Sequence, residues 1–182
     1  MFVPGSRRRK YLNDYQINEK GNYEYSGKCY RWAKPEQRGQ ILLRLWILNL
    51  AAMALTIGAG LIPAPGVSVR PILLISYAAS AALCVLCCIT LFRMTDEKDP
   101  LRDHVFDASV KKLPRRWLLC GAASLIGAAA EIIYYVPTEK GASLAFALVF
   151  SLLQTASAIL VLFCRKILTS LEWIPVDGKN LH

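Results

Sequence analysis

Long apolar segments alternate with short polar ones along most of this chain. The apolar runs cover residues 41–62, 72–92, 117–136 and 142–164, and no Asp or Lys interrupts any of them. A helix rises about 1.5 Å per residue, so about 20 apolar residues cross the hydrocarbon core of a bilayer. The pattern therefore predicts an all-α integral membrane protein with a bundle of four transmembrane helices.

Helix-breaking residues fill two of the gaps between these runs. The sequence Pro63-Ala64-Pro65-Gly66 separates the first two runs, and Pro137-Thr138-Glu139-Lys140-Gly141 separates the last two. Short segments of this composition form turns, so we expect two helical hairpins. The domains predicted are a polar segment over 1–40, a transmembrane domain over 41–164 with a polar loop at 93–116, and an amphipathic tail over 165–182.

Positive charge is concentrated in three of the polar segments. Nine Lys and Arg residues precede residue 41, seven lie in 93–116 and three follow residue 164, whereas each short turn has one. Basic segments stay on the cytosolic side, so the pattern predicts a multi-pass protein of the cytoplasmic membrane with both termini inside (N-in/C-in). This bias accounts for the net charge of +9 without nucleic acid, and we expect the basic face to contact anionic lipid headgroups.

The segment before the first run is rich in aromatic residues. Two aromatic stretches flank residues 19–22, whose composition is typical of a turn, so a small β-hairpin is predicted within 11–32. An isolated hairpin is marginal in water and needs a surface to rest on. The lipid headgroups, the polar loop at 93–116 and a protein partner are all candidates for this surface. The side chains expected at such a contact are Tyr15, Tyr23, Tyr25, Tyr30 and Trp32.

Two further polar segments carry apolar residues at helical spacing. Asp99-Pro100 resembles a helix start, and apolar residues recur from there to Leu113. A similar stripe follows in 165–174, where Trp173 can sit at headgroup depth. Both segments are predicted to be short cytosolic helices lying in the membrane interface.

A polar site inside the membrane is the main chemical candidate. Glu131 is the only acidic residue within a predicted span. An ionised carboxylate in the hydrocarbon region is costly, so it must be protonated, paired or hydrated. It is either the titrating group of a proton- or cation-coupled site, with Tyr77, Tyr134 and Gln154 as neighbours, or a structural residue that reaches the surface or bonds an adjacent helix. Gln154 alone would be typical of an amide that holds two helices together.

Three cysteines, Cys84, Cys87 and Cys88, share one helix face. They suit either a thiol redox or metal site or, as we favour, small apolar packing. No catalytic signature occurs and neither histidine lies in a span. We therefore predict no catalytic residue, no metal site and no cofactor.

The sequence thus favours a non-enzymatic accessory or scaffold subunit of a membrane assembly. Small residues at four-residue spacing on the spans allow close helix contacts, so the partner is either another membrane protein or a second copy of this chain. The alternative is a small oligomeric transporter or channel in which Glu131 is the intramembrane coupling residue.

Overall fold

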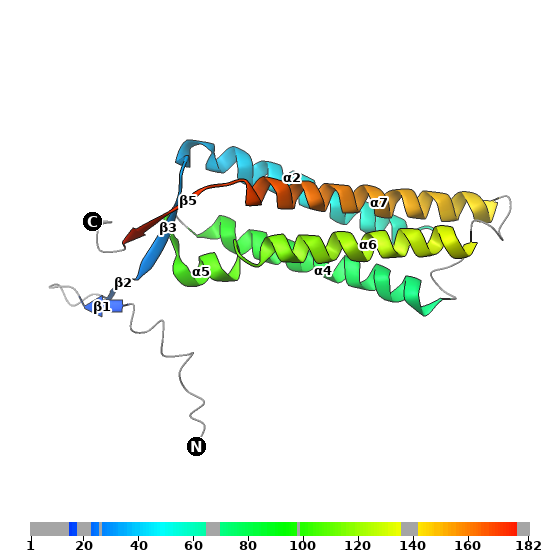
Figure 1. The fold of residues 1–182 in the computed structure, drawn as a ribbon, viewed down its shortest axis with the longest axis horizontal. Helices are drawn as coiled ribbons and strands as arrows, with labels where there is room; N and C mark the ends of the chain where they lie inside the picture. Colours follow the sequence, from blue (N-terminus) through cyan, green and yellow to red (C-terminus); the bar gives the residue numbers. More distant parts are fainter. Residues whose placement is uncertain are drawn as a thin grey trace, which may run out of the picture.

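Four long helices form most of the structure (Figure 1). They are α2 (Arg38–Gly60), α4 (Pro71–Asp96), α6 (Leu113–Tyr135) and α7 (Ala142–Thr169). The computed structural model describes residues 15–17, 23–25, 27–64, 70–97, 99–135 and 142–177. In this part of the chain, four helices are long and apolar enough to cross a membrane. They confirm the four predicted runs and suggest a multi-pass membrane protein.

The helices pack as a ring in which each contacts two neighbours. Helix α2 packs against α4 and α7, and α6 packs against the same two helices. Each helix buries one stripe and leaves large apolar side chains on the opposite face. On α7, for example, Phe150 and Val161 are buried, whereas Leu152 and Phe163 are more than half exposed. An apolar outer surface of this extent fits a lipid environment better than water.

A small sheet lies at one end of the bundle, which we call the sheet end; the opposite end is the distal end (Figure 1). Its strands are β3 (Lys28–Trp32), β4 (Leu101–Arg102) and β5 (Trp173–Asp177), in the antiparallel order β4-β3-β5. The short helices η1 (Pro35–Gln37) and α5 (Asp103–Ala108) complete this end. Three segments far apart in the sequence therefore form one layer.

Aromatic side chains hold this layer together. The rings of Tyr30 and Phe106 are stacked with centroids 4.0 Å apart, and Trp173 lies 5.2 Å from Phe106 and 4.8 Å from Trp32. Aromatic pairs at such separations add about 0.5–1.5 kcal/mol each beyond the area they bury. We call these four residues the aromatic cluster.

The sheet corrects two predictions made from the sequence. The helix expected from Asp99-Pro100 to Leu113 is shorter, because Leu101 is buried as a strand residue opposite Tyr30 and α5 covers only 103–108. Leu113 instead begins α6. The helical stripe expected over 165–174 is also wrong in its second half: α7 ends at Thr169, and Trp173 and Ile174 belong to β5. Pairing with β3 makes the extended form favourable, and Pro175 is tolerated because β5 is an edge strand.

The predicted hairpin is present as the antiparallel pair β1 (Tyr15–Ile17) and β2 (Tyr23–Tyr25), with Tyr15 opposite Tyr25. Its predicted turn at 19–22 lies outside the described residues. Tyr30 and Trp32, which the sequence placed with the hairpin, belong to the separate three-stranded sheet.

Candidate functional site

Asn49 is the centre of a polar network in the half of the bundle nearer the sheet end. Its side chain is fully buried on α2. The amide Nδ2 donates to Cys88 Sγ of α4 at 3.0 Å, and Oδ1 accepts from Trp117 Nε1 of α6 at 2.9 Å. One amide thus links three helices, which agrees with the packing role that polar residues have in membrane bundles.

A second group of contacts lies farther along the bundle. Thr56 Oγ1 and Ser157 Oγ are 2.9 Å apart, and the Ser157 hydroxyl donates to the carbonyl of Ala52. Beside them the Sγ atoms of Cys84 and Cys120 approach to 3.4 Å, and both are free thiols. The sequence grouped Cys84 with Cys87 and Cys88 and did not indicate Cys120, because spacing along one helix cannot reveal which residue of another helix lies opposite.

The distal half of the interior contains Glu131 and Gln154, whose side chains are 0% and 1% exposed. Ser151 Oγ on α7 lies 2.9 Å from the carbonyl oxygen of Ala147 on the same helix and 3.3 Å from that of Ala128 on α6. The second contact marks the level at which these two helices face each other. Neither polar atom of the Gln154 amide has a hydrogen-bond partner within the described structure, and the same holds for the Ser124 hydroxyl. Ser124 was not anticipated, because a lone serine in an apolar run is common.

The two tyrosines predicted to accompany Glu131 have different surroundings. Tyr77 is half-buried, with its hydroxyl against Gly60 and its ring 6.4 Å from that of Phe150. Tyr134 is 49% exposed, and the Arg70 guanidinium lies 5.7 Å from its ring centroid. Of the four predicted site residues, Glu131 and Gln154 are therefore the fully buried pair, and Tyr134 lies on the outer surface of α6.

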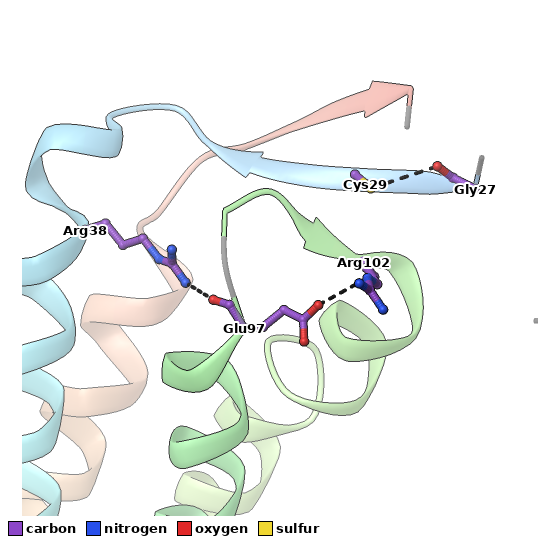
Figure 2. Close-up of polar contacts among 5 residues, drawn as sticks. All are labelled: Gly27, Cys29, Arg38, Glu97 and Arg102. Carbon is purple, nitrogen blue, oxygen red and sulfur yellow. Dashed lines mark hydrogen bonds and ion pairs between the residues drawn. The ribbon is translucent and has the colours of Figure 1, made fainter. Parts of the chain in front are cut away.

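At the sheet end, charged side chains connect the segments that form the layer (Figure 2). Arg38 donates to the carbonyls of Glu97 at 2.6 Å and Met94 at 3.5 Å, at the C-terminal end of α4. A cation at this position satisfies carbonyls that have no partner within the helix and stabilises the negative end of the helix dipole. The Glu97 carboxylate in turn pairs with Arg102 at 3.3 Å. Arg38 therefore joins the start of α2 to the end of α4.

The aromatic residues expected to contact a partner fall into two groups. Trp32 is 3% exposed and Tyr30 is half-buried, so both rings are engaged within the protein. Tyr15, Tyr23 and Tyr25 belong to the β1–β2 hairpin, where antiparallel partners occupy the same face of a two-stranded sheet. The register therefore assigns these three tyrosine positions to one face and Gln16 and Glu24 to the other.

The described residues contain no group of three His, Cys, Asp or Glu side chains placed to hold a metal ion. Near the sheet end, Asp99 pairs with Arg31 at 3.7 Å. Comparison with protein-family models, curated proteins and solved structures found no match to this chain.

Proposed function

We propose that this chain is a multi-pass protein of the cytoplasmic membrane that acts as a non-enzymatic accessory or scaffold subunit of a membrane assembly. The observation that carries the proposal is the layer at the sheet end. Strands from the beginning, middle and end of the chain meet there and are fixed by the aromatic cluster. Such a layer gives a bundle a shaped surface outside the membrane to which another protein can bind.

The charge distribution supports an orientation with both chain ends in the cytosol. Among the described residues, the positively charged side chains at or near the sheet end are Lys28, Arg31, Lys34, Arg38, Arg44, Arg93, Arg102, Lys111, Lys112, Arg115, Arg116, Arg165 and Lys166, whereas Arg70 lies at the distal end. Basic segments remain on the cytosolic side during insertion. The same residues would place anionic lipid headgroups around the layer.

The β1–β2 hairpin is the proposed contact with the partner, and its register supplies a matched test. The chain, tagged after residue 182, is extracted from native membranes in mild detergent, and the mass and composition of the complex are measured. We expect Tyr15→Ala/Tyr23→Ala/Tyr25→Ala to release a stoichiometric membrane protein. Gln16→Ala/Glu24→Ala, which changes the opposite face of the same strands, should retain it.

Deletion of residues 1–26 provides a second test. It removes the hairpin but leaves β3, so the three-stranded sheet and the helices keep their contacts. We expect normal insertion and loss of the partner. A pure homo-oligomer from the unaltered chain, or full retention of the partner by both altered chains, would refute the accessory role.

The complete burial of Glu131 favours a second candidate, a small oligomeric transporter or channel with this carboxyl at its coupling site. Proteoliposomes that contain a pH-sensitive dye and carry an imposed potassium gradient test for coupled proton movement. Glu131→Gln should abolish the flux, and Glu36→Gln at the exposed sheet end should not. Equal flux through Glu131→Gln would exclude this candidate.

A further inference from the structure

Two buried amides in this bundle are in opposite situations. The Asn49 amide forms hydrogen bonds to protein atoms through both its groups: Nδ2 donates to Cys88 Sγ, and Oδ1 accepts from Trp117 Nε1. Gln154 is equally buried, yet its Nε2 and its Oε1 are both without a protein partner in the described structure. A buried amide with neither group bonded is strongly unfavourable, so something other than protein is expected to satisfy Gln154.

The surroundings of Gln154 follow from the contact between Ser151 and Ala128. Because α6 and α7 run in opposite directions, Gln154 lies three residues from this contact toward the sheet end and Ser124 lies four. At the helical rise per residue, the Cα atoms of Gln154 and Ser124 differ in height along the bundle by only about 1.5 Å. The Ser124 hydroxyl is buried and has no partner in the described part of the chain either.

Glu131 lies on the other side of the same contact, three residues toward the distal end. Side chains on a helix lean toward its N-terminus. The side chain of Glu131 on α6 therefore leans toward the sheet end, and that of Gln154 on α7 leans toward the distal end. The two lean toward each other across the small residues Ala128 and Ser151, with their Cα levels about 9 Å apart at helical rise.

We propose that one or more water molecules are bound inside the distal half of the bundle, between the Gln154 amide, the Ser124 hydroxyl and the Glu131 carboxyl. Water fits because it donates and accepts at once. A metal cation would satisfy Gln154 Oε1 but would leave the two Nε2 hydrogens unbonded. The site is independent of the partner proposed above, because it lies in the bundle and not in the sheet-end layer.

Water-edited solid-state NMR of the full chain in lipid bilayers tests this directly. Side-chain amides are labelled with ¹⁵N in Gln and Asn, and the build-up of magnetisation from water to each amide is measured. We expect transfer to Gln154 to be several-fold faster than transfer to Asn49, the internal control. The Gln154 signal is assigned by its disappearance in Gln154→Met. Slow transfer to both amides, or equally fast transfer to both, would overturn the site.

Thermal unfolding of the same variants gives a second, independent result. If the Gln154 amide is bonded to water, Gln154→Met removes those bonds and lowers the unfolding midpoint. If the amide is dry, the same substitution removes an unsatisfied group and raises the midpoint. Ser124→Ala should slow the transfer from water to Gln154 while preserving the fold, since it deletes a single oxygen. A raised midpoint in Gln154→Met, or unchanged transfer in Ser124→Ala, would refute the proposal.

Discussion

The hydrogen bond between Asn49 and Trp117 makes a contribution to the free energy of unfolding that can be measured, because each residue can be replaced without changing the other. Asn49→Leu keeps the branched shape of the side chain but removes the acceptor of the Trp117 Nε1–H bond and the donor to Cys88. A buried donor left unbonded costs about 1–3 kcal/mol. Hydrogen bonds between membrane helices contribute less on average, about 0.6 kcal/mol, because the unfolded chain in the membrane also finds partners. We therefore expect Asn49→Leu to lower the free energy of unfolding by about 1–2 kcal/mol.

A double-mutant cycle separates this bond from packing. Trp117→Phe removes the indole N–H and part of a fully buried ring, so it has a cavity cost of its own. If the bond exists, the double variant is less destabilised than the two single variants added together, by about 0.5–1.5 kcal/mol. Reversible unfolding in mixed micelles, followed by circular dichroism, gives the four free energies.

The control for this cycle uses an outward-facing residue next to Trp117. Leu118 is 43% exposed, and the hydrogen-bond partners of the Asn49 amide are Cys88 and Trp117. Asn49→Leu and Leu118→Ala should therefore be additive within about 0.5 kcal/mol. Additivity between Asn49→Leu and Trp117→Phe, or an increase in stability on replacing Asn49 alone, would refute the assignment of this amide as a link between helices.

Three further predictions concern the sheet end. Arg38→Gln should destabilise the contact between α2 and α4 by about 1 kcal/mol, because charged hydrogen bonds to Glu97 and Met94 are lost from a partly exposed site. The control is Arg44→Gln, which changes an exposed residue of the same helix and should have little effect. Equal unfolding midpoints for the two variants would contradict this prediction. Phe106→Ala should destabilise the layer by about 3 kcal/mol, because it removes the ring stacked on Tyr30. We expect this loss to appear as faster proteolytic cleavage within 97–112. An unchanged cleavage rate would show that the aromatic cluster is dispensable. Burial raises the pKa of the Cys29 thiol, so this thiol stays protonated at pH 8 and should react with maleimide only after unfolding. Fast labelling of the folded protein would show that β3 exposes this thiol to solvent.

The sequence identified Glu131 and Gln154 as polar residues within the spans, because a polar side chain is easily recognised in an apolar run. It could not anticipate that Asn49 has two partners while Gln154 has none among the described residues, since partners come from other helices. Tyr134 illustrates the same limit: it lies one turn from Glu131 in the sequence but on the outer face of α6. Which face a residue occupies depends on how α6 rotates against α4 and α7.

Local patterns alone determined the four helices and the hairpin strands, because helix length, apolar content and strand-forming residues act over a few neighbouring positions. The predicted turns at 65–66 and 137–141 lie outside the described residues. The three-stranded sheet was decided only by tertiary structure. Residues 101–102 and 173–174 belong to helical stripes in the sequence, yet they are extended because β3 lies between the two segments and offers backbone hydrogen bonds on both edges. A strand of two residues has no stability of its own, and it forms only where the rest of the fold brings a partner to it.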